Sequence, residues 1–248
     1  MTGVLDFLAD HRGDVLRRAL EHAQISGIAL LVALAVALPI ALWLAHSGRG
    51  GFLAINASNV GRALPSLAII AIVFSLPGFG LRQSTVIFAL VLLGIPPMLT
   101  NAYVAVRGVD RDVVEAARGM GMRGMEILRG VELPLAAPVI MAGIRTAAVQ
   151  IVATATLGAL VASGGLGTFI VDGIAVQDTA SIVTGALLVA VLAILTDVAF
   201  GALERAVTPA GLAMAQESTG RGRGRARRGA PARGDDVPAA DQSERVDA

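Results

Sequence analysis

The residues of this chain that could do chemistry are few, and their arrangement does not favour catalysis. The sequence has no cysteine, which excludes disulfides, thiolate catalysis and cysteine-bound zinc. It also has no lysine, which excludes Schiff-base chemistry and a Walker A loop, because that loop needs a lysine to reach the nucleotide phosphates. The three histidines, His11, His22 and His46, are too scattered to indicate a metal site. We therefore expect no catalytic residue, metal or cofactor, and any ATP hydrolysis linked to this chain must come from another subunit.

Charged and small residues are concentrated at residues 107–134, which read RGVDRDVVEAARGMGMRGMEILRGVELP. Asp110 and Asp112 precede an apolar run, so we expect a helix that begins near Asp112, with acids at the end that the helix dipole favours. Gly119 and Gly121 should end this helix, and a second short helix fits residues 124–130. Two short helices with small residues where they meet are typical of a docking element, although composition alone fits a charged surface loop equally well.

The spacing in this segment resembles the EAA signature of permease subunits in binding-protein-dependent ATP-binding cassette importers. The match begins with the triplet Glu115, Ala116 and Ala117 and continues with Gly121. It ends with Val131, Leu133 and Pro134. Val131 stands where the pattern prefers isoleucine. The resemblance covers about residues 23–203 and implies the type I permease fold, which the methionine-importer permease shares. It also implies that this coupling loop enters a groove of the ATPase subunit, with Gly121 at a turn where glycine adopts a positive φ at little cost.

The resemblance further implies three protein partners. These are a separate ATPase subunit, an extracytoplasmic substrate-binding protein, and a second permease that is either another copy or a paralogue. The binding protein would dock on the outer surface, which includes a turn containing Gly164, Gly165 and Gly167. Taken from the residues alone, these glycines predict a tight turn at a helix end.

Residues 64–68, 108–110 and 132–147 resemble the osmoprotectant branch of these permeases, which carries glycine betaine, carnitine or choline. The methionine branch is the alternative, because it shares the five-span plan and the glycine-rich turn. Proteins bind quaternary ammonium groups with aromatic cages. Because only 4% of the residues are aromatic, we expect that cage to lie in the binding protein rather than in this chain.

The elements that carry these residues are predicted to lie in a membrane. The chain is 55% hydrophobic and 16% charged, and it has no carboxylate between Glu21 and Asp110. An ionised group at the bilayer centre costs about 2.5 kcal/mol or more, so such a run suits lipid. Stretches long enough to cross a bilayer as helices lie at about residues 23–45, 60–76, 85–106, 135–161 and 180–203. We predict an all-α, polytopic bundle of five transmembrane helices, the second of which is the least regular because Pro65 lies near its start.

The distribution of arginine predicts the orientation, since short cytoplasmic loops collect cations. With five spans and the N-terminus outside, the inner connections hold most of the arginines: Arg49, Arg62, the five from Arg107 to Arg129, and those from Arg205 onward. The outer side holds Arg12, Arg17, Arg18 and Arg82. Residues 1–22 have mixed charge and lack the features of a signal peptide. We therefore predict a multi-pass protein of the bacterial cell membrane, with residues 1–22 outside and the C-terminus in the cytoplasm.

Apart from Arg62 at the inner end of the second span, two charged residues lie within the predicted spans. Arg145 and Asp197 should both lie roughly 12 to 17 Å from the inner boundary, which makes them candidate partners. A charge within a span favours a functional role, but a link between two helices explains the pair equally well. Gln150, Thr154 and Thr156 give the fourth span a polar stripe, which fits either a pore lining or hydrogen bonds between helices.

The segment 208–248 differs in composition from the spans and contains the run GRGRGRARRG. It is too polar to bury a core, so we expect a disordered cytoplasmic tail. Its arginines fit anionic lipid headgroups or a passive role in fixing topology, and the lack of interleaved aromatic residues argues against nucleic-acid binding. A membrane-bound enzyme would need clustered histidines or carboxylates. A secondary transporter usually has an internal repeat, and the sequence shows neither feature.

Overall fold

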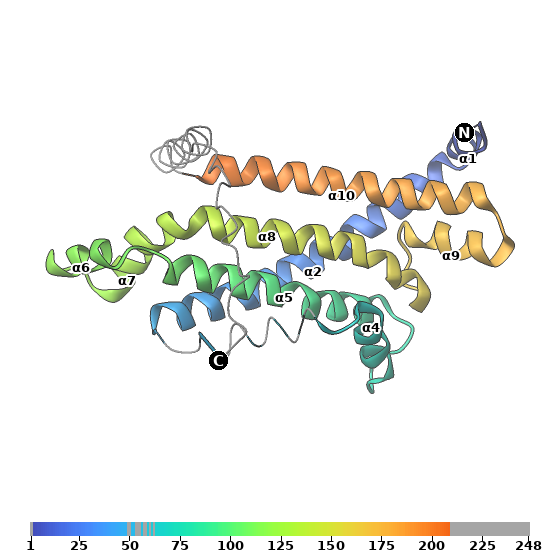
Figure 1. The fold of residues 1–248 in the computed structure, drawn as a ribbon. Coiled ribbons are helices and arrows are strands. Elements are labelled where there is room, and N and C mark those ends of the chain that lie inside the picture. The colour runs from blue at the N-terminus through green and yellow to red at the C-terminus, as the bar shows by residue number, and fades with distance from the viewer. Residues whose placement is uncertain are drawn as a thin grey trace, which may run out of the picture. The chain divides into compact units, whose positions relative to one another are not determined.

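A computed structural model of the chain is an all-helical bundle (Figure 1), which confirms the predicted fold class. The structure describes residues 2–48, 51, 52, 56, 59, 61 and 63–208. The long helices are α2 (Arg12–His46), α5 (Gln83–Arg107), α8 (Leu133–Ala155) and α10 (Thr179–Val207). The shorter ones are α1 (Thr2–Asp10), α4 (Ser66–Ser75), α6 (Arg111–Gly119), α7 (Gly124–Ile127) and α9 (Gly167–Val176). A π turn (Leu128–Glu132) precedes α8, and a 3₁₀ turn (Thr156–Val161) follows it.

Among the described residues, four helices are long and apolar enough to cross a membrane, whereas the sequence predicted five. In the second predicted span, residues 60–76, Gly61 and Ala63 are helical, but the helix is interrupted at Leu64 and Pro65 and resumes as the ten-residue helix α4. This helix begins at Ser66 because Pro65 has an extended backbone, with φ −61° and ψ 129°, and a proline also disfavours helical geometry in the residue before it. Residues 60 and 62 of that span lie outside the described residues, as does nearly all of the predicted tail.

Small residues let the central helices approach one another closely. Ala29, Ala33, Ala37 and Ala41 recur every fourth residue along α2, and each has an exposed fraction of 0%. A Cβ atom added at Gly94 on α5 would lie only 2.7 Å from Cδ1 of Ile151 on α8. Helices in lipid associate through this kind of close packing, since burial of apolar surface gives them no driving force there. Helices α2, α5 and α8 therefore supply most of the core, to which α4 adds Ile69, Ile70 and Val73.

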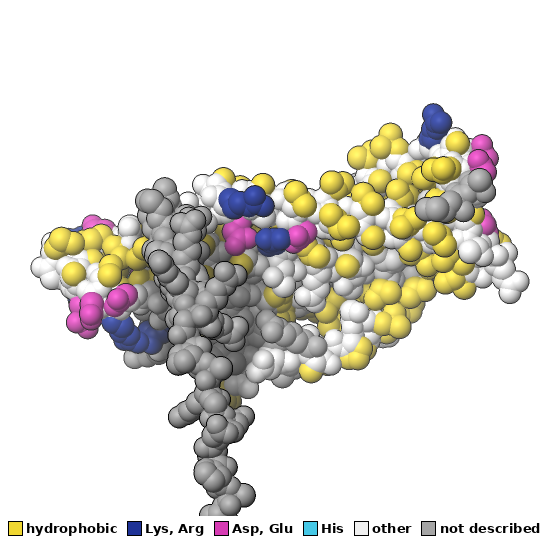
Figure 2. Space-filling view, turned by 45° about the horizontal axis from the view of Figure 1, so that its top comes forward, with side chains coloured by type: hydrophobic (Ala, Val, Ile, Leu, Met, Phe, Trp, Pro, Cys, Tyr) yellow, Lys and Arg dark blue, Asp and Glu magenta, His cyan; other side chains and the backbone are white. Residues whose placement is uncertain are grey.

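Helix α10 packs less completely than the others. Only 6% of its most apolar 18-residue stretch is buried, whereas 61% of the corresponding stretch of α5 is buried. Helix α10 lies along one side of α8 (Figure 1). Figure 2 shows hydrophobic side chains over most of the visible face, with charged side chains at both ends and one charged group between them. This outer surface suits contact with lipid tails.

The two ends of the bundle carry different elements. Helices α6 and α7 extend from one end, whereas α1 and α9 lie at the other (Figure 1). The C-terminus of α2 and the N-terminus of α8 meet at the α6–α7 end, where His46 contacts Glu132. The predicted coupling loop and the predicted glycine turn are therefore at opposite ends of the same helices.

Candidate functional site

Helix α6 has a hydrogen-bonded cap at each end. The Asp110 carboxylate accepts a hydrogen bond from the backbone N–H of Asp112 at 2.9 Å, so the helix begins at Arg111. At the other end, the N–H of Gly121 donates to the carbonyl of Arg118, and that of Met122 donates to the carbonyl of Ala117. This pair of bonds is a Schellman motif, which needs a left-handed residue. Gly121 is that residue, with φ +89°.

The second predicted helix of the loop is not separate. Helix α7 begins at Gly124 and runs through the π turn into α8 without a break. Pro134 contributes to this geometry, because it has no N–H to donate to the carbonyl of Gly130 as a regular α-helix would require. The turn widens instead, and the N–H of Leu133 donates to the carbonyl of Leu128.

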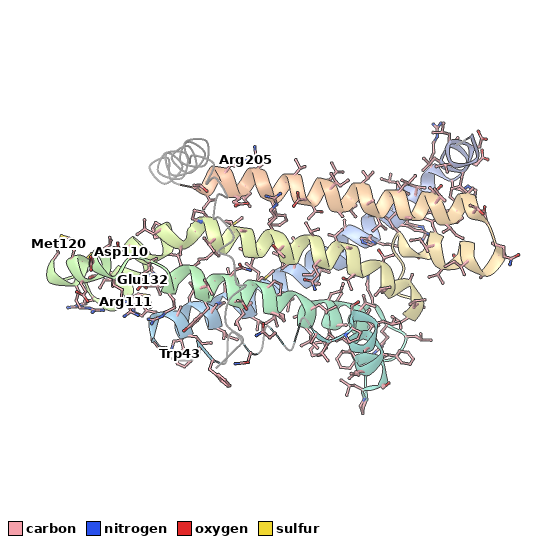
Figure 3. All side chains as sticks on the ribbon, viewed as in Figure 1. Trp43, Asp110, Arg111, Met120, Glu132 and Arg205 are labelled. Carbon is pink, nitrogen blue, oxygen red and sulfur yellow. The ribbon has the colours of Figure 1, made fainter. Side chains whose placement is uncertain are left out.

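The signature residues occupy both halves of this loop. Ala117 is buried with 3% exposure, while Glu115 and Ala116 face outward. Val131 and Leu133 are half-buried in and just after the π turn. Figure 3 shows Met120 at the tip of the loop, with Asp110 and Glu132 nearer to the bundle. Met120 is 77% exposed, so the loop presents an apolar tip beside charged side chains.

A small polar cavity of about 160 Å³ lies at the base of the loop. Its lining includes ionisable side chains from α2, α5, α6 and the π turn: His46, Arg107, Arg111, Glu115, Arg118 and Glu132. His46 Nδ1 lies 2.9 Å from Glu132 Oε2, a contact between residues 86 positions apart. Sequence reasoning missed both residues of this contact, because no local pattern joins them.

Arg145 and Asp197, which the sequence placed at similar depth, are in direct contact. Arg145 donates from Nε to Asp197 Oδ1 at 2.6 Å and from Nη2 to Oδ2 at 2.7 Å. Arg145 Nη1 also lies 3.4 Å from Glu204 Oε2, and a Cβ atom at Gly201 would lie 3.1 Å from Nη1. The pair is not inside the bundle as expected, since the two side chains are 37% and 42% exposed. It joins α8 to α10 at the surface.

The glycine turn at the opposite end is held by the start of α2. Gly164 and Gly165 have φ of +81° and +80°, and the N–H of Gly165 donates to the Glu21 carboxylate at 3.1 Å. A Cβ atom at Gly167 would collide with the backbone carbonyl of Thr156. All three glycines are therefore required by the geometry of the turn.

The predicted polar stripe of the fourth span is only partly buried. Gln150 and Thr154 are half-buried on α8. The Oγ1 atom of Thr156 is buried and has no hydrogen-bond partner among the described residues. A bond from this hydroxyl to another helix of the described chain is therefore not formed.

The bundle and its loop agree with a known family. The family described as the binding-protein-dependent transport system inner membrane component matches residues 37–209, and the chain belongs to it. This protein is thus a multi-pass inner-membrane component of a transport system.

Particular relatives cover most of both chains. The chain is 39% identical to the choline transport system permease protein OpuBB of Bacillus subtilis (strain 168), over 88% of this chain and 99% of that one. It is 38% identical to the glycine betaine/carnitine/choline transport system permease protein OpuCB of the same organism, over 86% and 97%. A solved structure of the MetNI methionine ABC transporter, in an inward-facing conformation, matches with a TM-score of 0.70 at 20% identity, over 81% and 99%. At that identity the structural match shows the fold alone.

Proposed function

We propose that this chain is the permease subunit of an ATP-driven importer for a quaternary ammonium osmoprotectant, such as choline, glycine betaine or carnitine. The observation that carries the proposal is the similarity, over nearly the full length of the relatives, to permeases named for these compounds. The methionine alternative has only the shared fold in its favour. Among the described residues aromatic rings meet in small groups, as in the Phe79–Phe88 contact, so we assign cargo selection to the binding protein.

We assign ATPase docking to the coupling loop at residues 107–134. Two features support this assignment. The loop extends from the end of the bundle, with the exposed apolar residues Val113, Met120 and Met125 beside charged ones. Its second helix, α7, is also joined to α8 by a continuous helical path, so a force on α7 would reach a membrane-spanning helix directly. ATP hydrolysis itself belongs to a separate subunit, because this chain has no lysine for a Walker A loop.

We place the α6–α7 end in the cytoplasm and the α1–α9 end outside. The loop at the α6–α7 end has five arginines from Arg107 to Arg129, which the positive-inside rule assigns to the cytoplasm. Trp43 and Arg205 also lie near this end (Figure 3), and both residue types are common where a helix meets the membrane surface. The glycine turn at residues 164–167 is then part of the outer surface on which a binding protein docks.

We infer that a second permease, either a copy or a paralogue, packs against the side of the bundle where α4 lies. An apolar cavity of about 640 Å³ opens between α4 and α5, with Leu64, Ile72, Leu92 and Ile95 in its lining. Helix α10 lies on the opposite side of the bundle (Figure 1). Hollows of this size suit a partner helix better than lipid tails, since close packing is what holds helices together in a membrane.

Uptake of labelled compounds tests the cargo assignment. Cells with and without this subunit are supplied with labelled choline, glycine betaine, carnitine and methionine, each at low external concentration. We expect loss of the subunit to abolish uptake of at least one quaternary ammonium compound and to leave methionine uptake unchanged. Loss of methionine uptake with unchanged uptake of the other three would contradict the proposal.

A further inference from the structure

The contact between His46 and Glu132 joins the end of α2 to the base of the coupling loop. His46 is the last residue of α2, and Glu132 is the last residue of the π turn that connects the coupling loop to α8. Their side chains are 31% and 11% exposed, and the atoms Nδ1 and Oε2 lie 2.9 Å apart. The contact therefore ties the inner end of one spanning helix to the base of the loop.

The Glu132 carboxylate needs such a partner. A carboxylate removed from water is costly unless it is hydrogen-bonded, and the imidazole N–H of His46 supplies the bond. Arg107, Arg111 and Arg118 line the same cavity, but none forms an ion pair with Glu132 among the described residues. The carboxylate is thus paired with His46 of α2 rather than with an arginine of the same cavity.

The imidazole also touches the other side of the loop. A Cβ atom added at Gly124, the first residue of α7, would lie 3.0 Å from His46 Nε2. The ring therefore lies between the start of α7 and the end of the π turn. Ala41, Leu44 and Ala45 of α2 already pack in one apolar cluster with Leu128 of the π turn. Packing of α2 against the base of the loop therefore does not require a polar contact. A polar pair adds what an apolar contact lacks, which is a defined geometry.

We propose that His46 and Glu132 are a positioning pair that transmits movement of the coupling loop to α2. The inference rests on the proposed function, because it assumes that the loop moves when the ATPase subunit works. His46 touches neither cargo nor nucleotide in this arrangement and acts through Glu132. Without the pair, the loop still docks and ATP is still hydrolysed, but α2 no longer follows, so hydrolysis proceeds with less transport.

The test compares transport with hydrolysis in the complete complex. The chain is reconstituted in liposomes with its ATPase, permease partner and loaded binding protein, and cargo uptake per ATP hydrolysed is measured. We expect His46→Ala to assemble normally and to keep its ATPase rate, while uptake per ATP falls about tenfold, the scale of one lost hydrogen bond to a charged group. His46→Asn, whose amide nitrogen replaces Nδ1, should recover most of the ratio. His11→Ala is the matched control, because His11 is an exposed histidine whose ring bonds the carbonyl of Phe7 and stacks on the ring of Phe7, four residues earlier in the chain.

A double-variant cycle tests the pairing itself. If the two residues act through each other, His46→Ala combined with Glu132→Ala should lower uptake per ATP no further than His46→Ala alone. Independent, multiplying losses would overturn the proposal. So would an unchanged ratio in His46→Ala, or a parallel loss of assembly, ATPase rate and uptake in both the Ala and Asn variants. A wild-type complex that hydrolyses ATP but takes up none of the quaternary ammonium compounds would contradict the proposed cargo instead, and the two failures are thereby distinguished.

Discussion

At the scale of single residues, the coupling loop depends on one backbone conformation. Gly121 has φ +89° and closes α6, yet a Cβ atom at this position meets no other atom within 4 Å. Steric crowding within this chain is therefore not the reason for a glycine at this position. Either the left-handed backbone or close approach of the ATPase subunit requires it, and two substitutions separate these causes.

We expect Gly121→Val to abolish uptake while the chain still inserts into the membrane. A left-handed backbone costs a residue with a side chain about 1–2 kcal/mol, and valine adds bulk at the docking surface. Gly121→Asn adds similar bulk, but asparagine tolerates positive φ better. Uptake, ATPase stimulation and the amount of membrane-bound protein are measured for both variants. Loss of uptake in both variants indicates that close approach of the ATPase subunit requires glycine. Loss of uptake in the valine variant alone indicates that the left-handed backbone of the turn requires it. If the valine variant keeps both uptake and ATPase stimulation, the docking assignment of Gly121 is wrong.

The Arg145–Asp197 pair predicts a different pattern. Arg145→Gln leaves Asp197 without its cation, and Asp197→Asn leaves Arg145 with only the longer 3.4 Å contact to Glu204. Each single neutralisation should therefore lower thermal stability and expression. The double neutral variant should recover part of the loss. Thermal unfolding of the purified chain in detergent measures this. Asp14→Asn is the control, because its pair with Arg17 is exposed on both sides and contributes little. If the stability losses of the two single variants simply add in the double variant, the contact between Arg145 and Asp197 does not stabilise the protein.

At the scale of elements, apolar length predicts the long helices well, and proline and tertiary contacts account for what was missed. The spans around α2, α5, α8 and α10 follow from long apolar runs. The short α4 does not, because a hydropathy window does not register that Pro65 sets the start of the helix. The π turn was not predicted either, because Pro134 lies just after its end while other prolines of this chain lie inside regular α-helices. The His46–Glu132 contact joins residues 86 positions apart. No local pattern contains such a contact.

The outer glycine turn can be tested as an element. Gly167→Ala places a methyl group against the Thr156 carbonyl, so we expect a loss of stability of about 1–3 kcal/mol, typical of overpacking. Gly27→Ala is the matched control, because Gly27 lies within α2 with no atom within 4 Å of its added Cβ. The control should be neutral or slightly stabilising, since alanine favours helix more than glycine does. Equal thermal stability of the Gly167→Ala variant and the wild type would contradict the close packing of this turn.

At the scale of the whole molecule, the two sides of the bundle differ. The α4 side is hollowed by an apolar cavity, while the α10 side is a largely unburied helix joined to the core partly by charged residues. A chain without cysteine suits labelling at single introduced positions. Ile72 on α4 and Leu195 on α10 are 60% and 59% exposed, so they form a matched pair of positions.

We expect Ile72→Cys, labelled with a photoreactive maleimide in native membranes, to cross-link to a second permease. Leu195→Cys, labelled in the same way, should remain largely uncross-linked, because we place lipid around α10. Mass spectrometry of the product identifies the partner as another copy of this chain or a paralogue. Cross-linking to a permease from position 195 and not from position 72 would place the second subunit on the opposite side.

The π turn gives the fixed spacing of the loop a geometric meaning. An α-helix rotates by about 100° per residue, so the extra residue in a π turn sets the direction in which α7 leaves α8. Pro134 maintains that direction, since it withholds the N–H that would complete an α-helical turn to Gly130. The number of residues between Gly121 and Pro134 therefore sets the rotation of the loop about the helix axis as well as its distance from α8. Deleting any one of residues 124–130 would keep every signature side chain and yet turn the start of α7, and α6 with it, by about 100° around the axis of α8, away from the ATPase subunit that we propose it meets.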